Sequence, residues 1–348
     1  MNGIQIQEHT FDRPTDMAYP FADGTIDTPV GSVLRVKTVL ENRDRWGAVG
    51  ARTGLGRSHY TVLPGLYGVG NPDADAPVLV TANYKLTFDI LRSSLVGIDT
   101  WILVLDTKGI NVWCAAGKET FSTTEVVRMV KRTELDGVVS HRKLILPQLS
   151  ATGVSAKEVK SGSGFRVVWG PIQARHIKPF LEAGMNAEPS MRQVTFTFRE
   201  RLVLVPVELY ISMKPLLYVL SGLLIVSLIL HSTAFFINTF LVVIMGLFSG
   251  AVLVPLLLPW IPGRSFALKG AIVGILIGIL AGGPSGLFEG ITGGLSFFLS
   301  IIAISSYLAM NFTGSTPFTS PSGVEKEMRR AIPFQLAGLT IAIACMFL

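Results

Sequence analysis

The sequence predicts a Rossmann-like α/β domain followed by an all-α transmembrane domain of five helices. The chain has 348 residues, of which 49% are hydrophobic and only 16% are charged, which is too apolar for a purely soluble protein of this length. Of the 54 Lys, Arg, Asp and Glu residues, only 8 lie from Pro215 onward. We therefore expect an unassigned N-terminal extension (1–55), an α/β domain (56–213) and a transmembrane domain (214–348).

Hydrophobic periodicity predicts the elements of the α/β domain in order. Strands are expected at 76–82, 100–106, 137–139, 143–146, 165–169 and 193–204, and helices at 85–95, 111–119, 122–133 and 172–183. The helix at 122 begins with Ser122 and Glu125 at the spacing of a capping box. Strands that alternate with helices predict a parallel sheet with helices on both faces. Ligands of such sheets bind at the loops that follow the carboxyl ends of the strands.

The C-terminal part contains five apolar runs close to the roughly 20 residues that cross a bilayer. They lie at about 215–230, 234–258, 266–283, 291–310 and 331–348. Lys and Arg occur in the loops after the second and fourth runs and not in those after the first and third, so the positive-inside rule predicts a multi-pass protein of the cytoplasmic membrane. Its N-terminal domain would lie in the cytoplasm and its C-terminus outside. Glycines at 270, 274, 278 and 282 predict a close-packing face on the third helix.

Charge and motif composition argue against several functions. The formal charge of +6 is not gathered into a basic run with interleaved aromatics, so we expect no nucleic-acid partner. The first thirty residues show no apolar core of a secretory signal. Two distant cysteines, Cys114 and Cys345, indicate a reducing compartment rather than a disulfide framework. A P-loop, a dinucleotide-binding glycine motif, a zinc-ligand cluster and the Asp-x-His-x-x-Gly cobalamin motif are all absent from the sequence.

The run 111–118 (NVWCAAGK) is the most informative segment. Asn111 is a good N-cap, so Cys114 is expected in the first turn of a helix, where the partial positive charge favours a thiolate. Lys118 adds positive charge one turn later, and the small residues after Cys114 would let a large flat metal cofactor approach the helix. Two other interpretations stay open: a buried structural cysteine, which is commoner, and a nucleophile paired with one of the histidines.

Four loops are expected to converge on one rim of the sheet, at 81–84, 111–118, 147–153 and 170–171. The candidate cofactor-binding residues on these loops are Thr81, Asn83, Asn111, Val112, Trp113, Ala115, Ala116, Gly117, Lys118, Pro147, Gln148, Leu149, Gly153, Gly170 and Pro171.

At this point the residues resemble a known family. The run 111–118 resembles the signature of HgcA, the family of mercury-methylating corrinoid proteins, and the C-terminal helices resemble the membrane domain of that family. Residues 76–208 resemble the corrinoid domain of the corrinoid iron–sulfur protein of the acetyl-CoA pathway. The supporting segments are VLVTANYKLTFD (78–89), LVLDTKGINVWCAAGK (103–118), HRKLILPQLSATGV (141–154) and VVWGPIQA (167–174).

The resemblance implies a corrinoid cofactor of the cobalamin type, held by the four loops, with Cys114 as the axial cobalt ligand. It implies a corrinoid-dependent methyltransferase that passes a methyl group from the Cys-ligated methyl-Co(III) corrinoid to Hg(II), giving methylmercury. A thiolate is a suitable ligand for cobalt, and the soft Hg(II) ion is a suitable acceptor. The alternative is a corrinoid methyl carrier of one-carbon metabolism with another acceptor.

The resemblance also implies partners. The chain has no cysteine-rich motif for an iron–sulfur cluster of its own, so the family's ferredoxin-like iron–sulfur protein, HgcB, is the expected electron donor. A methyl-folate-dependent protein is the expected methyl donor. From another class, a membrane transport or scaffold protein that retains only the corrinoid fold is a third possibility.

Overall fold

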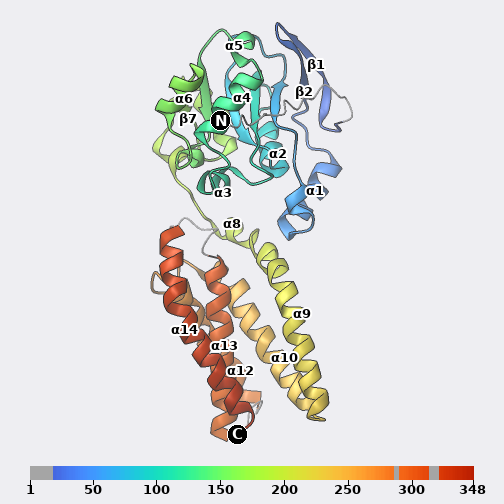
Figure 1. Cartoon of the computed structure of the whole chain (residues 1–348), viewed down its shortest axis with the longest axis vertical. Coiled ribbons are helices and arrows are strands. Elements are labelled where there is room, and N and C mark those ends of the chain that lie inside the picture. The colour runs from blue at the N-terminus through green and yellow to red at the C-terminus, as the bar shows by residue number, and fades with distance from the viewer. Residues whose placement is uncertain (1–18, 286–289, 313–320) are drawn as a thin grey trace, which may run out of the picture. The chain divides into compact units, whose positions relative to one another are not determined.

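The computed structural model describes residues 19–285, 290–312 and 321–348 (Figure 1). The chain divides into two compact units, one ending at Val194 and the other beginning at Thr195, with residues 52–54 grouped with the second. The first unit contains the α/β fold and the second is helical. Both types of structure predicted from the sequence are therefore present. The first 18 residues of the predicted N-terminal extension lie outside the described part.

The first unit is built on one seven-stranded sheet in the order β1-β2-β3-β5-β4-β6-β7. The strands are β1 (Ala22–Thr28), β2 (Gly31–Val36), β3 (Gly65–Val69), β4 (Val78–Ala82), β5 (Thr100–Leu105), β6 (Lys143–Leu146) and β7 (Arg166–Trp169). Strands β5, β4, β6 and β7 are parallel, whereas β3 is antiparallel to β5 and β1 is antiparallel to β2. The sheet is thus mixed, which corrects the prediction of a purely parallel sheet.

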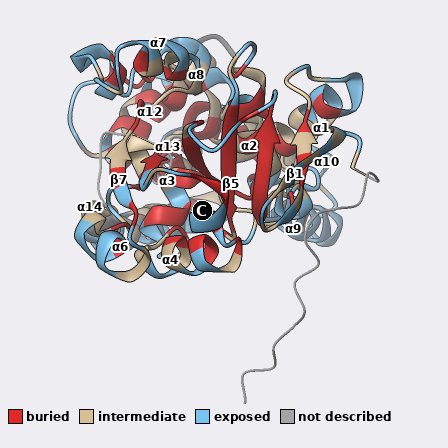
Figure 2. Cartoon of the chain, turned by 90° about the horizontal axis from the view of Figure 1, so that it is seen from above, coloured by how far each residue is buried: buried red, intermediate tan, exposed pale blue. Residues whose placement is uncertain are grey.

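Helices cover both faces of the sheet, as predicted. Along β5, Trp101 and Leu103 join one hydrophobic core, with α3, α4, α5 and α6, while Ile102 and Val104 join the other, with α2 and α7. Figure 2 shows the central strands as almost wholly buried. The helices are α1 (Asn42–Thr53), α2 (Lys85–Ser93), α3 (Val112–Gly117), α4 (Thr123–Arg132), α5 (Leu135–Val138), α6 (Ala156–Ser163) and α7 (Ile177–Glu182), with short 3₁₀ turns η1 (Arg57–His59), η2 (Gln148–Ser150), η3 (Ala174–His176) and η4 (Pro189–Arg192).

Two predicted strands are wrong. The residues at 137–139 fall mainly in α5, where Leu135 and Val138 are buried together at helical rather than strand spacing. The alternating run 193–204 instead passes through α8 (Phe198–Leu202). Thr197 and Glu200 form a complete capping box there, and this local hydrogen bonding starts a helix despite the alternation of Val194, Phe196 and Phe198.

The second unit consists of α8, α9 (Val205–Ile229), α10 (Thr233–Leu247), a π-helical segment η5 (Phe248–Leu253), α11 (Val254–Leu257), α12 (Phe266–Ser285), α13 (Gly290–Asn311) and α14 (Pro321–Met346). Within the described residues, three helical runs are long and apolar enough to cross a membrane: Phe198–Ile229, Thr233–Leu257 and Gly290–Asn311. The apolar part of α12, Phe266–Gly282, is shorter. All five predicted spans fall on helices, and the count of five spans stays a prediction.

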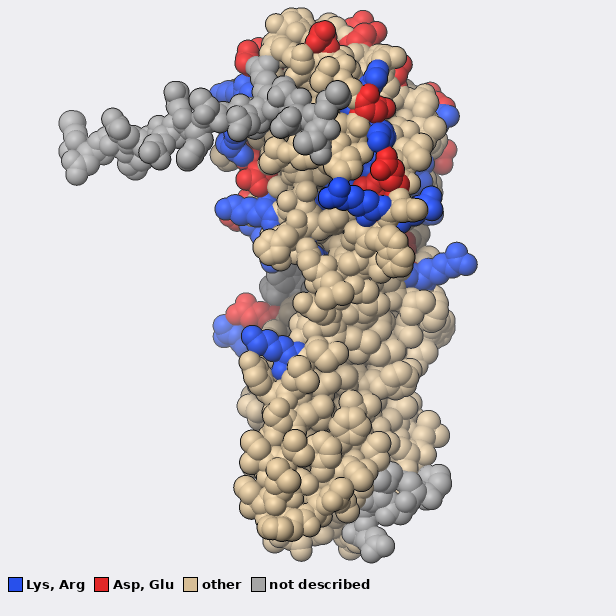
Figure 3. Space-filling view, turned by 90° about the vertical axis from the view of Figure 1, so that its right-hand side faces the viewer, with Lys and Arg blue, Asp and Glu red and all other residues tan. Residues whose placement is uncertain are grey.

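The predicted close-packing face of α12 is confirmed. A Cβ added at Gly270 would lie 2.5 Å from the carbonyl oxygen of Ser305, and one at Gly274 would lie 3.1 Å from Cα of Ile302. Only glycine therefore allows α12 and α13 to approach this closely. Figure 3 shows Lys, Arg, Asp and Glu gathered on the first unit, while the visible surface of the helical unit is largely without charge.

Candidate functional site

The site is built around α3, whose start is fixed by Asn111. The Asn111 side chain accepts a hydrogen bond from the main-chain N–H of Cys114 at 2.9 Å, which is the N-cap that the sequence predicts. Val112, Ala115 and Ala116 turn into the core, whereas Cys114 is exposed. The interpretation of Cys114 as a buried structural cysteine is therefore wrong.

The loop between β5 and α3 is tied to the end of β4 by Asn83. The Asn83 Oδ1 atom accepts hydrogen bonds from the Thr107 main-chain N–H and hydroxyl and from Gly109 N–H, at 2.9 to 3.1 Å. Its amide donates to Asp106 at 3.3 Å. Asn83 is only 6% exposed, and its polar atoms are directed to this loop. Asn83 thus holds the loop that precedes α3 by hydrogen bonds, a role that the sequence did not reveal.

Helix α4 holds the same loop from the other side. Ser122 caps α4 by accepting from Glu125 N–H, but the Glu125 carboxylate accepts from Asp106 N–H at 2.9 Å instead of completing the capping box. Arg128 also donates to Glu125, and this hydrogen bond raises the pKa of the Arg128 guanidinium above its ordinary value. The loop that leads into α3 is consequently bonded on both sides.

A cavity of about 310 Å³ opens beside α3 at the carboxyl ends of β4, β6 and β7. Because β5 lies on one side of β4 and β6 on the other, the chain reverses its direction of progress at β4 and β6, which is the topological switch point where open α/β sheets bind ligands. The lining residues are mostly apolar: Leu79, Val80, Thr81, Thr87, Ile90, Leu91, Asn111, Val112, Trp113, Ile145, Leu146, Pro147, Leu149, Gly170, Pro171, Ile172, Ala174 and Ile177.

All four predicted loops reach this cavity. The predicted residues that line it are Thr81, Asn111, Val112, Trp113, Pro147, Leu149, Gly170 and Pro171. Trp113 is half-buried and forms part of the cavity wall, next to the exposed Cys114. The other predicted residues lie outside the lining: Asn83, Cys114, Ala115, Ala116, Gly117, Lys118, Gln148 and Gly153. Among these, Gln148 accepts a hydrogen bond from Arg192, and Ala115 and Ala116 are buried on the inner face of α3.

Two glycines at α3 face different surroundings. A Cβ added at Gly153 would lie 2.4 Å from the Phe121 carbonyl oxygen and 2.8 Å from that of Ala116, so Gly153 lets the 147–153 loop pack against the inner side of α3. A Cβ at Gly117 would meet nothing within 4 Å. Gly117 and Cys114 are both exposed, and they are one helical turn apart. The Cys114 thiol is therefore exposed on the outer face of α3, and no described side chain crowds the adjacent Gly117.

The residues that line the cavity opposite α3 were not predicted from the sequence. Ile90 and Leu91 of α2, together with Ile172 and Ile177 near α7, complete the cavity on the second face of the sheet. The helical spacing of Ile90 and Leu91 predicted a helix but not which side chains would face a ligand. Cys114 has no histidine beside it in the contacts that the structure shows, and no cluster of three potential metal ligands occurs among the described residues.

The first unit is an α/β domain whose parallel core, β5-β4-β6-β7, has a cavity at its switch point, the place where open α/β sheets bind ligands. Residues 56–181 match the family model of the CO dehydrogenase/acetyl-CoA synthase delta subunit. The acetyl-CoA decarbonylase/synthase complex subunit gamma of Archaeoglobus fulgidus is 34% identical over 128 residues, which are 36% of this chain and 27% of the relative. The gamma subunit of Methanocaldococcus jannaschii is 32% identical over 129 residues, 36% of this chain and 26% of the relative.

The matched segment contains β3 to β7 and every residue of the cavity lining. The chain spans about a quarter of the length of these relatives. The likeness thus concerns the domain that carries the candidate site, and the helical unit lies outside it.

Proposed function

We propose that the first unit binds a corrinoid and takes part in methyl transfer. The observation that carries this proposal is the exposed thiol of Cys114 on a capped helix, beside an apolar cavity at the switch point of the sheet. Two findings support the cofactor class. The matched relatives are subunits of an acetyl-CoA decarbonylase/synthase complex, and the segments around the cavity resemble the corrinoid domain of that pathway.

The residues fit a corrinoid in three respects. The cavity wall is apolar and suits the hydrocarbon edge of a macrocycle. Gly117 leaves the outer face of α3 open to a flat ligand. The Cys114 sulfur is a soft donor of the kind that cobalt accepts. A corrinoid is larger than the cavity, so it would also cover part of the outer face of α3.

Each residue of the site then has a defined task. When bound, the corrinoid would supply a cobalt–carbon bond from which a methyl group can be donated. Cys114 would hold the cobalt from the side of α3, with its orientation fixed by the Asn111 cap. Trp113 would keep water from the metal–sulfur contact by its place in the cavity wall. Asn83 would keep the loop before α3 in register without touching the ligand.

The finer proposal concerns the acceptor. The match to acetyl-CoA decarbonylase/synthase subunits favours a corrinoid methyl carrier in one-carbon metabolism. The resemblance of residues 111–118 to the mercury-methylating family, together with the attached apolar helices, favours Hg(II) as the acceptor. We propose Hg(II), and we take the one-carbon acceptor as the second candidate. Both functions use the same site, so they differ only in which methyl acceptor reaches the bound corrinoid.

Partners and location form part of this proposal. No iron–sulfur cluster motif is present in the sequence, so reduction of the cofactor calls for an external ferredoxin-like donor such as HgcB, and a methyl-folate-dependent protein would supply the methyl group. The apolar helices indicate membrane association. A cytoplasmic position of the first unit is the orientation that the positive-inside rule favours.

The experiment is anaerobic methyl transfer from protein loaded with methylcobalamin, with Hg(II) as the acceptor. Cys114→Ala should lose methyl transfer and should change the visible absorption spectrum of the bound corrinoid, because the cobalt loses its sulfur ligand. Cys345→Ala is the matched control and should behave as wild type, since Cys345 lies in α14.

Full activity in Cys114→Ala would contradict the ligand role. Corrinoid binding without methylmercury, in wild type as well, would exclude Hg(II) and leave the one-carbon carrier. Failure to bind any corrinoid would contradict the proposal as a whole.

A further inference from the structure

Helix α1 presents an exposed face that the proposed function does not use. Trp46 is 74% exposed and Val49 is 48% exposed, one helical turn apart, and Leu55 just beyond the helix is 64% exposed. A tryptophan left this far in solvent is unusual, because tryptophan is highly buried on average. The inner side of α1 carries the buried Ala51 and Asp44 instead.

The charge of this segment is almost entirely basic. Between Asn42 and His59 the basic residues are Arg43, Arg45, Arg52, Arg57 and His59, and the only acidic residue is Asp44. Arg43 and Arg45 are exposed, and both lie within the helical turn that precedes the exposed Trp46.

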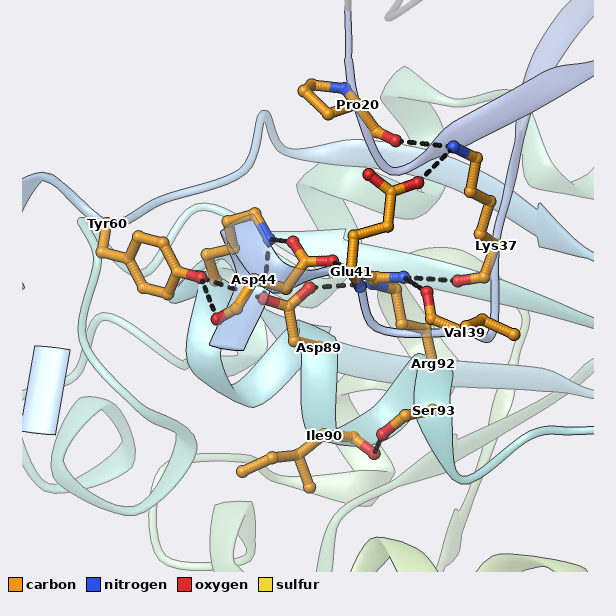
Figure 4. Close-up of polar contacts among 11 residues, drawn as sticks. Pro20, Lys37, Val39, Glu41, Asp44, Tyr60, Asp89, Ile90, Arg92 and Ser93 are labelled. Atoms are coloured by element: carbon orange, nitrogen blue, oxygen red, sulfur yellow. Dashed lines mark hydrogen bonds and ion pairs between the residues drawn. The ribbon is translucent and has the colours of Figure 1, made fainter. Parts of the chain in front are cut away.

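Asp44 does not offset these charges, because it turns inward (Figure 4). Its carboxylate bonds Lys85 at 2.6 Å and Arg92 at 2.7 Å. Asp89 bonds the same two cations at 2.6 and 2.8 Å, so the two acidic and two basic side chains form a buried network that balances its own charge. Among the described residues, no ion pair joins an acidic side chain to Arg43 or Arg45 on the outer face of α1.

The chain tethers the first unit to the helices that could cross a bilayer. The first unit ends at Val194, and the first predicted span begins near residue 215, so residues 195–214 connect the two. A helical segment of this length reaches about 30 Å, at about 1.5 Å per residue. A membrane surface is therefore present at high effective concentration for any lipid-binding face of the first unit.

From these observations we propose that the basic α1 face (Arg43, Arg45, Trp46, Val49 and Leu55) docks on the anionic phospholipid head groups of the membrane that holds the helical unit. Tryptophan favours the interface between head groups and acyl chains, where its ring is apolar and its N–H can bond to water or lipid. Arginines near the surface are attracted to anionic head groups. Docking would restrict the motion of the first unit relative to the bilayer, and it does not depend on the cofactor.

The test uses the full chain reconstituted in nanodiscs whose lipids carry bromine on their acyl chains. One set contains phosphatidylcholine only, and the other also contains phosphatidylglycerol. The chain has five tryptophans, so the emission of Trp46 is taken as the difference between wild type and Trp46→Phe. We expect the bromolipids to quench most of the Trp46 emission in anionic nanodiscs and little of it in neutral ones.

Charge is tested by removing two cations at a time. Arg43→Gln with Arg45→Gln should abolish the quenching of Trp46, and high salt should weaken it in wild type because it screens exposed charges. The matched control is Lys157→Gln with Lys160→Gln, two exposed cations of α6, which should leave the quenching unchanged. These four positions are on the surface, so the fold is expected to persist, and circular dichroism verifies this.

Three results would overturn the proposal. Trp46 could stay unquenched in both lipid mixtures, it could be quenched equally in both, or it could become shielded only when a partner protein is added. The last result would assign the basic α1 face to a protein instead of a lipid surface.

Discussion

Gly117 is the last residue of α3 and is exposed, whereas Gly153 belongs to a loop that packs against the inner face of α3. At Gly153, carbonyl oxygens stand 2.4 and 2.8 Å from the position of an added Cβ, and both belong to the main chain. Main-chain atoms cannot move aside as a flexible side chain can, so a methyl group there displaces the loop or α3. At Gly117 no atom of the described residues lies within 4 Å of an added Cβ, so the space there is open to a ligand.

The two glycine-to-alanine changes should therefore have opposite effects. Gly153→Ala should destabilise the first unit by about 1–3 kcal/mol, the usual cost of overpacking. Gly117→Ala should leave the stability of the ligand-free protein unchanged or raise it by up to about 1 kcal/mol, because alanine favours helix over glycine, yet it should weaken corrinoid binding. Urea denaturation and corrinoid titration of both variants measure this. Wild-type corrinoid affinity in Gly117→Ala would argue against a ligand on the outer face of α3.

At the scale of elements, α3 is a six-residue helix whose position depends on hydrogen bonds from outside it. Three of them converge on Asn83 Oδ1, and a fourth joins Glu125 to Asp106 N–H. A helix this short is not stable by itself. The cap at Asn111 and the bonded loop therefore decide where Cys114 points.

Asn83→Ala should loosen α3 without touching the cavity. The change leaves Thr107 N–H and Gly109 N–H without their acceptor, at a cost of about 1–3 kcal/mol for the buried Thr107 group. We expect faster amide hydrogen exchange at these two residues and weaker corrinoid binding. Asn83→Asp keeps the acceptor oxygen but places a second carboxylate near Asp106, so it should lie between Asn83→Ala and wild type. Unchanged amide hydrogen exchange in Asn83→Ala would show that the loop before α3 keeps its structure without the hydrogen bonds to Asn83.

The buried ion network joins α1 to α2 in a similar way. Burial raises the pKa of Asp44, but the hydrogen bond from Lys85, the Glu41 N–H and the charge of Lys85 outweigh it, so the pKa lies below the ordinary 3.8. A group with a lowered pKa in the folded state stabilises the fold above its unfolded pKa. That stabilisation is lost as the pH falls below 3.8 and through the folded pKa.

Asp44→Asn tests this dependence. At neutral pH it should destabilise the packing of α1 by about 3–5 kcal/mol, because it breaks a buried ion network from one side. Below pH 3.8 the difference from wild type should shrink, since protonation removes the same charge in wild type. Hydrogen exchange of the α1 amides across this range measures the gap. A gap that stays constant at acidic pH would mean that the charge of Asp44 contributes little.

At the scale of the whole molecule, the surfaces of the two units suit different solvents, water for the first unit and lipid for the helical unit. The first unit buries apolar strands and carries most of the charge, whereas the helical unit exposes many apolar side chains, such as Leu228 at 66% and Leu280 at 72%. Exposed leucines over helices of this length are expected where lipid is the solvent. The three described runs that could cross a membrane leave the roles of α12 and α14 to experiment.

Residue 326 distinguishes five spans from three. With five spans, Lys326 lies on the same side of the membrane as the first unit, because α12 crosses. With only the three long runs crossing, it lies on the opposite side. We expect Lys326→Cys, with Cys114 and Cys345 replaced by serine, to resist labelling by an impermeant thiol reagent added outside. His231→Cys, in the loop after the first span, is the control and should be labelled. Outside labelling at residue 326 would exclude the five-span topology.

The sequence by itself determined the two-part organisation and the central strands. Charge segregation and apolar runs are properties of the sequence alone, and β4, β5, β6 and β7 each contain an apolar run that is recognisable locally. The cap of α3 was also predictable, because Asn111 and the N–H it bonds are only three residues apart. Hydrogen bonds and hydrophobic periodicities within one element involve residues that are close in sequence, so they can be predicted from the sequence.

Only the tertiary structure decided the rest. The short, glycine-containing β3 is a strand because it pairs with β5 across more than thirty residues of sequence, and that pairing makes the sheet mixed. The part played by Asn83 depends on a loop 24 residues further on. The cavity forms because Ile90, Ile177 and Trp113, which are far apart in sequence, line the same space. Asp44 is buried in an ion network because Lys85 and Arg92 of α2 pair with it. Contacts between distant segments depend on the packing of the whole unit, and no local pattern specifies them.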